Sequence, residues 1–197
     1  MHESQESTVR GWLSALLLPF SCSALPALAG GFDQTLTLQG IQFRVTSANQ
    51  GSVNTLHILP SGRLKQRSPI KQEIMGTVTG AEIADLNADG WPEIYVYVTS
   101  AGSGSYGSVV GYAVNRGKSV TPIYFPELAD DPVTAKGYLG HDQFTIIEST
   151  LARRFPLYRD GDSNGAPSGG QRQLAYRLMA GEAGWVLQLE KAKTRDF

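Results

Sequence analysis

Polar and apolar residues alternate along most of the chain from about residue 30 onward. The alternation is strict in residues 35–38 and 41–45, and turn-forming residues separate such runs. Because neighbouring side chains of a strand point to opposite faces of a sheet, this period of two predicts β-strands rather than helices. In residues 93–99 (EIYVYVT), by contrast, both odd- and even-numbered positions are mostly apolar, which predicts a central strand buried on both faces. The expected strands are 35–38, 41–45, 53–59, 93–99, 108–114, 120–125, 143–148, 172–178 and 185–189, with about nine or ten in all.

The segments between these strands favour one antiparallel domain. Residues 115–118 (NRGK) and 180–184 (AGEAG) have the composition of hairpin turns. Only two short segments, 131–136 and 149–154, are candidates for helical turns. The sequence shows no internal repeat and no interdomain linker, so we expect residues 30–197 to form a single all-β domain. Its predicted architecture is an antiparallel β-sandwich or barrel with one or two short helical turns.

Residues 1–29 have the features of a signal peptide. An apolar run over residues 12–18 precedes small residues and the trio Ala27-Leu28-Ala29, which is an A-x-A cleavage pattern. The run is too short to span a bilayer, so it predicts export with cleavage before Gly30. The alternative is a buried N-terminal helix.

The composition narrows the partners of the exported chain. Cys22 is the only cysteine and lies inside the predicted signal peptide, so we expect the mature chain to have neither a thiol nor a disulfide. Removing Glu3, Glu6 and Arg10 from 18 acidic and 17 basic residues leaves equal numbers, and no basic run stands out. Neither nucleic acid nor an anionic membrane surface is therefore an expected partner.

An Asp/Asn-rich run, Asp85-x-Asn87-x-Asp89, has the oxygen spacing of a calcium loop. The twelfth position of such a loop normally holds a bidentate Glu, but here it is Val96, while Glu93 lies at the ninth. With that ligand missing, we interpret the run as Asx-turns, in which short side chains bond to their own backbone. Calcium stays an alternative at Asp85, Asn87, Asp89 and Glu93, and no other cofactor is expected.

Two further motifs resemble ligand sites without meeting their requirements. Residues 160–165 (DGDSNG) repeat the calcium spacing, with Gln171 at the twelfth position. Residues 102–107 (GSGSYG) match the glycine spacing of a dinucleotide-binding loop, but that loop must lead into a helix whose N-terminus receives the phosphate. The segment that follows, residues 108–114, is an expected strand, so the nucleotide interpretation fails.

The loop over residues 100–107 is the strongest functional candidate. It joins the two best strands of the chain and is longer than a hairpin needs. One interpretation is a flexible hairpin tip. The other is a protruding finger whose glycines let the backbone enter a narrow cleft, while Ser103, Ser105 and Tyr106 bring hydroxyl groups.

Residues suited to catalysis are sparse, so we do not expect an enzyme. The mature chain has two histidines, His57 and His141, far apart in sequence, and no cysteine nucleophile. No serine lies in a nucleophile-elbow sequence. A hydrolase that uses two carboxylates brought together by the fold stays open as an alternative, because the sequence does not reveal such a pair.

Several blocks of sequence together resemble one known family. The first block is 85–98 (DLNADGWPEIYVYV), and 103–107 (SGSYG) follows it. Later blocks are 140–144 (GHDQF), 153–156 (RRFP), 161–164 (GDSN) and 172–173 (RQ). In these blocks the chain resembles the periplasmic inhibitors of i-type (invertebrate-type) lysozyme, over most of its length from residue 85 onward.

The resemblance implies a β-sandwich-like fold in the periplasm of a Gram-negative bacterium, where the protein would protect the cell wall from lysozyme. It also implies that one short element enters the catalytic cleft of the lysozyme. In this sequence that inhibitory element consists of Ser103, Gly104, Ser105 and Tyr106.

Arg116 and Lys118, at the far end of the following strand, are candidates for rim contacts with the lysozyme. A homodimer is compatible with this interpretation. The main alternative is a calcium-dependent extracellular binding module, for carbohydrate for example, that uses the two Asp/Asn-rich loops.

Overall fold

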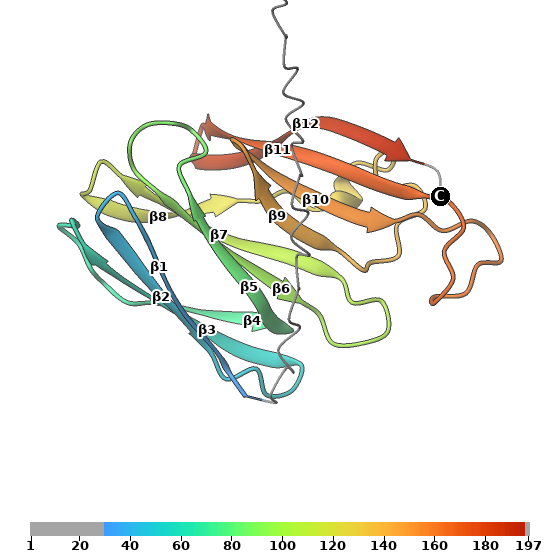
Figure 1. Ribbon diagram of the computed structural model, residues 1–197, viewed down its shortest axis with the longest axis horizontal. Coiled ribbons are helices and arrows are strands. Elements are labelled where there is room, and N and C mark those ends of the chain that lie inside the picture. The colour runs from blue at the N-terminus through green and yellow to red at the C-terminus, as the bar shows by residue number, and fades with distance from the viewer. Residues whose placement is uncertain (1–29, 196–197) are drawn as a thin grey trace, which may run out of the picture.

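A computed structural model describes residues 30–195, so the predicted signal peptide lies outside the described residues. The described chain is all-β, as predicted, and its two sheets pack against each other (Figure 1). The first sheet contains, in spatial order, β1 (Phe32–Leu38), β2 (Ile41–Ser47), β3 (Val53–Gly62) and β4 (Ile70–Met75). The second sheet contains β5 (Thr77–Ala84), β6 (Glu93–Thr99), β7 (Gly107–Asn115), β8 (Ser119–Tyr124), β9 (Gln143–Ile147), β10 (Thr150–Pro156), β11 (Gln171–Gly181) and β12 (Gly184–Arg195).

Strand β6 lies at the centre of the molecule because it is apolar on both faces. Ile94, Val96 and Val98 face the first sheet and join one hydrophobic core, while Tyr95 and Tyr97 face the second core. The prediction of a central strand over residues 93–99 is therefore confirmed. One strand contributes side chains to both cores and so fixes the two sheets relative to each other.

The second sheet curls until its two edge strands, β5 and β9, approach each other. The carboxylate of Glu82 on β5 closes this seam, because it accepts hydrogen bonds from the Ile146 backbone N–H of β9 (3.3 Å) and from the Tyr97 hydroxyl (2.9 Å). The middle of the sheet contains its only parallel contact among the described strands. There β8 and β12 are joined by two residue pairs, Trp185 with Ile123 and Val186 with Tyr124.

The predicted helical turns have different outcomes. The only helical element of residues 30–195 is the 3-10 turn Leu128–Asp130, and the predicted helical turn at 131–136 corresponds to successive turns over residues 132–137. The interpretation of 149–154 as a helical turn is wrong, because all of this segment after residue 149 belongs to strand β10. The side chains of Leu151, Arg153 and Phe155 point to the core from one face of β10. In the sequence, the charged Arg153 interrupts the alternation of apolar and polar residues, so the pattern does not reveal this buried face.

Besides β10, strands β4 and β5 are missing from the strands expected from the sequence. Strand β4 is an edge strand that carries Lys71 and Glu73, and β5 contains Gly80 beside an irregularity in its pairing with β6. Charged residues on an edge strand prevent pairing with other chains, and they also weaken the alternating pattern. No helix within residues 30–195 is long and apolar enough to cross a membrane.

Shortening one buried side chain of β6 tests the role of this strand in holding the two sheets together. We expect Val96→Ala to lower the free energy of unfolding by about 2–3 kcal/mol, because it removes buried methyl groups and leaves a cavity. The matched control is Val133→Ala, whose side chain is exposed and whose loss should change stability by less than about 0.5 kcal/mol. Urea unfolding of both variants measures the difference, and equal losses would contradict the central position of β6.

Candidate functional site

The loop between β6 and β7, residues 100–106, projects beyond the last strand pair, Thr99 with Gly107. It lies at the right-hand end of the molecule in Figure 1, beside the connection between β10 and β11. Ser103 and Tyr106 are exposed, with 48% of the Tyr106 surface accessible, and Ser105 is half-buried. The structure thus brings the predicted inhibitory element to the surface at one end of the molecule.

Hydrogen bonds within the loop close its neck. The Ser100 N–H donates to the Tyr106 carbonyl (2.8 Å), and the Tyr106 N–H donates to the Ser100 hydroxyl oxygen (3.0 Å). Ser105 has a φ of +44°, a left-handed conformation that is unusual for a residue with a side chain. The turn before Tyr106 is therefore held in one unusual backbone conformation.

Two other loops support this finger from outside. The His141 N–H donates to the carbonyls of Gly104 (2.8 Å) and Ser105 (3.2 Å), and the Asn164 amide donates to the carbonyl of Ser103 (2.6 Å). At Gly140 a Cβ atom would lie 1.9 Å from the Gly104 carbonyl oxygen, so only glycine allows this approach. The finger is therefore fixed by contacts and is not a free hairpin tip.

A buried ion pair anchors the base of the finger. Asp142 accepts hydrogen bonds from Arg153 Nε (2.7 Å) and from the Gly107 N–H (2.7 Å), which is the first residue of β7. The Tyr138 hydroxyl also donates to Asp142, and Arg153 Nη2 contacts that same hydroxyl oxygen (2.8 Å). Because the Asp142 and Arg153 side chains are only 0% and 5% exposed, this network joins β7, β10 and the segment before β9 inside the protein.

The surroundings of Arg153 explain how a charge is tolerated there. Burial by itself would lower the pKa of the guanidinium, but the Asp142 carboxylate outweighs it and holds the pKa above its ordinary value. Four aromatic rings also lie 5.1–5.9 Å from the guanidinium carbon, in the range of cation–π contacts. They belong to Phe125, Tyr138, Phe144 and Phe155.

Tyr106 forms one wall of a hollow of about 500 Å³ at the base of the finger. Its ring contacts Tyr138 edge-on, with centroids 5.6 Å apart. Met75, from the end of β4, also lines this hollow and is exposed. The finger therefore presents hydroxyl groups next to a hollow whose lining is partly apolar (Met75, Leu128) and partly polar (Glu127, Arg153).

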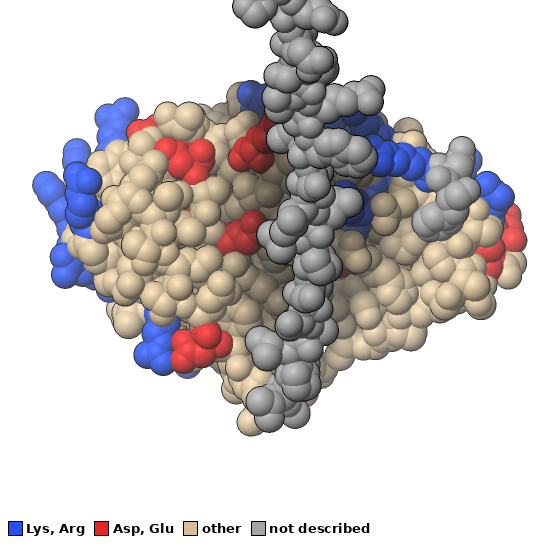
Figure 2. All heavy atoms as spheres, viewed as in Figure 1, with Lys and Arg blue, Asp and Glu red and all other residues tan. Residues whose placement is uncertain are grey.

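The proposed rim residues, Arg116 and Lys118, are not brought to the finger. They lie in the β7–β8 turn, at the opposite end of β7 and about 26 Å away for nine strand residues. There the fold places them beside Arg63 and Lys65, since the Lys65 N–H donates to the Gly117 carbonyl (2.8 Å). Figure 2 shows one group of basic side chains at the left-hand end of the molecule and a second group toward the upper right.

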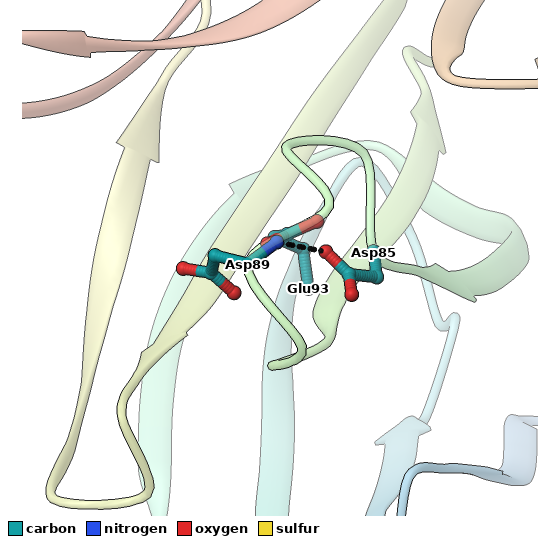
Figure 3. Close-up of side chains that lie close together, drawn as sticks. All are labelled: Asp85, Asp89 and Glu93. Atoms are coloured by element: carbon teal, nitrogen blue, oxygen red, sulfur yellow. Dashed lines mark hydrogen bonds between the residues drawn. The ribbon is translucent and has the colours of Figure 1, made fainter.

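The first Asp/Asn-rich run forms the connection between β5 and β6 (Figure 3). Asp85 accepts hydrogen bonds from the N–H groups of Asp89 (3.0 Å) and Gly90 (2.9 Å), and Asn87 also accepts from Asp89 (3.0 Å). The expected Asx-turns are therefore present. The fold adds Glu93 to the run, so that carboxylate oxygens of Asp85, Asp89 and Glu93 lie within 4.8 Å of one another.

Glu93 is an unusual member of this cluster because it is 0% exposed. One carboxylate oxygen accepts a hydrogen bond from the Leu86 N–H (2.8 Å), and the other has no hydrogen-bond partner among the described residues. Burial raises the pKa of Glu93 to about 8, and the nearby charges of Asp85 and Asp89 add to that increase. The Tyr95 hydroxyl, next on the same face of β6, lies near this carboxylate and lowers its pKa, but within residues 30–195 neither Tyr95 Oη nor the second Glu93 oxygen has a partner in hydrogen-bond geometry.

The second Asp/Asn-rich run serves the finger instead of forming a carboxylate cluster. Asp162 accepts hydrogen bonds from the Arg159 N–H (2.7 Å) and from Ser168, and these bonds hold the pKa of its carboxyl below the ordinary value. Asn164 binds the finger carbonyl and also contacts a ring nitrogen of His141 (3.2 Å). His57 lies on β3 in the other sheet, so the two histidines are not brought together.

The supports of the finger, Asp142, Arg153 and Asn164, were not predicted as site residues. They are separated from it by 35 to 61 positions, so only the fold shows the contact. The blocks that contain Asp142 and Arg153 were noted as possible site segments only through the family resemblance, and Asn164 was noted also as part of the second Asp/Asn-rich run. A comparison of the chain with models of known protein families finds no match, and a comparison with curated proteins finds no similar sequence.

Breaking the buried ion pair should destabilise the base of the finger. We expect Asp142→Ala to cost about 3–5 kcal/mol of stability, because it leaves the Arg153 guanidinium buried without its carboxylate. The control is Glu190→Ala, which breaks the more exposed pair with Arg177 and should cost less than about 1 kcal/mol. Urea unfolding measures both, and a loss as small as that of the control would show that Asp142 does not anchor the finger.

Proposed function

We propose that this protein inhibits lysozyme, most specifically i-type lysozyme, by inserting the finger Ser103-Gly104-Ser105-Tyr106 into the catalytic cleft. One observation carries the proposal. The sequence blocks that resemble the lysozyme inhibitors are far apart in the chain, yet their residues His141, Asp142, Arg153 and Asn164 meet around this finger. Such convergence is the arrangement expected of one binding site.

The chemistry of the finger suits a glycosidase cleft. Lysozyme-type cleavage uses two carboxyl groups, and an ionised carboxylate only accepts hydrogen bonds. The Ser103 and Tyr106 hydroxyls are neutral donors at an exposed tip. A neutral finger needs no basic surface around it, which agrees with the location of Arg116 and Lys118 at the opposite end of β7.

The rigidity of the finger favours tight binding. A loop that is already held in its bound conformation loses little conformational entropy when it enters a cleft. Here the contacts from His141 and Asn164 restrain the backbone on both sides of Gly104. Tyr106 adds a large, half-exposed ring, the kind of side chain that often dominates an interface.

Export to the periplasm of a Gram-negative bacterium belongs to the same proposal. There the protein would protect the cell wall from host or competitor lysozyme without any chemistry of its own. A calcium-dependent extracellular binding module is the second candidate, and the carboxylate cluster of Asp85, Asp89 and Glu93 favours it. Calorimetry with cell-wall oligosaccharides, with and without calcium, distinguishes the two, because only a carbohydrate module should release heat.

Truncation of Tyr106 tests the proposed inhibitory finger. We expect Tyr106→Ala to weaken inhibition at least thirtyfold, since loss of a buried interface tyrosine costs about 2 kcal/mol or more. Ser103→Ala should cost about 1.5–3 kcal/mol of binding if its hydroxyl donates to a charged carboxylate. The measurement is cell-wall lysis by i-, c- and g-type lysozymes with each variant, together with its thermal unfolding.

The matched control is Tyr124→Ala, which removes a more exposed tyrosine (61% against 48%) from β8 and should leave inhibition unchanged. The two finger substitutions should not add simply, because both groups share one cleft. Unchanged inhibition by Tyr106→Ala would refute the insertion of the finger. A large drop in its melting temperature would instead assign Tyr106 a structural role.

A further inference from the structure

We propose that the β5–β6 loop is a calcium site in which Asp85, Asn87, Asp89 and Glu93 supply the side-chain ligands. This inference is independent of the proposed inhibitory function. The site lies at the other end of β6 from the finger, about 20 Å away for seven strand residues. Calcium would therefore act on the fold and not on the contact with lysozyme.

The buried Glu93 is the observation that separates this loop from an ordinary Asx-turn. Asx-turn hydrogen bonds explain the positions of Asp85, Asn87 and Asp89, but they do not explain a carboxylate of 0% exposure with one unpartnered oxygen. Leaving such an oxygen buried without a partner costs free energy. Asp85 and Asp89, within 4.8 Å of it, further disfavour its ionised form, unless a cation lies among the three carboxylates.

The geometry suits calcium. Oxygen ligands of calcium lie about 2.3–2.6 Å from the ion, so two ligands on opposite sides are about 5 Å apart. The three carboxylates meet that limit. Magnesium requires shorter distances and nearly ideal octahedral geometry, which a set of loop side chains meets less readily.

The spacing also explains why the missing twelfth ligand is not decisive. In a helix–loop–helix site the last ligand comes from the helix after the loop, at the twelfth position. Here the chain enters strand β6 directly after the loop, and Glu93 is the first residue of that strand. Figure 3 shows Glu93 reaching the loop from the strand, beside Asp85 and Asp89. The strand thus supplies a ligand at the ninth position, and Val96 belongs to the core.

A cation in this loop would also strengthen contacts between the two sheets. The Gln39 amide, in the turn between β1 and β2, donates to Asp85 (2.8 Å). Trp91 lies against Gly117 in the β7–β8 turn, where a Cβ atom would approach its ring to 2.6 Å. Ordering the loop therefore orders its neighbours in both sheets.

Thermal unfolding of the mature protein in EDTA and in calcium tests the site. We expect calcium at ten times its Kd, itself on the order of 10⁻⁴ M, to raise the melting temperature by about 3–6 °C. Magnesium at the same concentration should give a smaller shift. Calorimetric titration with calcium should show one site per chain.

Glu93→Gln keeps the shape of the side chain and should abolish the calcium-dependent shift while still unfolding cooperatively in EDTA. If this variant does not fold, Asp89→Asn, at an exposed position, replaces it in the test and should likewise abolish the calcium-dependent shift in melting temperature. The matched control, Asp160→Asn, removes a carboxylate from the second Asp/Asn-rich run and should keep the full shift. The proposal is wrong if 10 mM calcium gives neither heat nor a shift, or if Glu93→Gln responds like the unmodified chain.

Lysozyme inhibition measured in EDTA separates the two proposals. We expect inhibition to survive chelation near room temperature, because the finger and its supports contain no ligand of the loop. Inhibition that is lost in EDTA and restored by calcium would overturn the structural role proposed for calcium. Absence of inhibition in both solutions, together with a calcium-dependent melting shift, would refute the inhibitor proposal alone.

Discussion

The burial of β6 on both faces is the constraint on which the other features depend. Its even-numbered residues belong to the core between the sheets, and its tyrosines belong to the core inside the curled sheet. The strand can therefore neither slide nor rotate without exposing one of the two sets. Both candidate sites begin at its ends, the carboxylate loop at Glu93 and the finger just after Thr99. A rigid strand thus fixes the distance between them.

The polar network below the finger has a different role from the hydrophobic cores. Replacing a buried ion pair by apolar residues often leaves stability unchanged or increases it, so Arg153 and Asp142 are weak evidence for stability as such. Their role here is to orient the neighbouring backbone through hydrogen bonds of fixed direction. Asp142 binds the first N–H of β7, and Tyr138 joins the same carboxylate while its ring supports Tyr106. Apolar side chains in those places would fill the space without orienting the start of the strand.

How much of the structure could be predicted from the sequence depends on whether each feature rests on neighbouring residues or on residues far apart in the chain. Alternation over 41–45 and the apolar run over 93–99 report burial directly, so these strands were found. The interpretation of 149–154 as helical was wrong because the partner that neutralises Arg153 lies 11 residues away, in a different segment. The loop at 100–107 was recognisable by its length and composition. The rigidity of this loop could not be predicted, because it depends on Gly140, His141 and Asn164, which contact the loop only in the folded chain.

The two-pair contact between β8 and β12 divides the protein into halves that are continuous in sequence. Strands β1 to β8 form hairpins only with one another, and so do β9 to β12. Local pairings of this kind form quickly, whereas the joining of the halves must close a longer loop. The finger belongs to the first half, but all its outside supports belong to the second. During synthesis the hairpins of the first half can therefore form while the binding loop is still unrestrained, although one face of β6 is covered only by the second half. The finger becomes rigid only when the last strands dock, so its ability to bind would report the completion of folding.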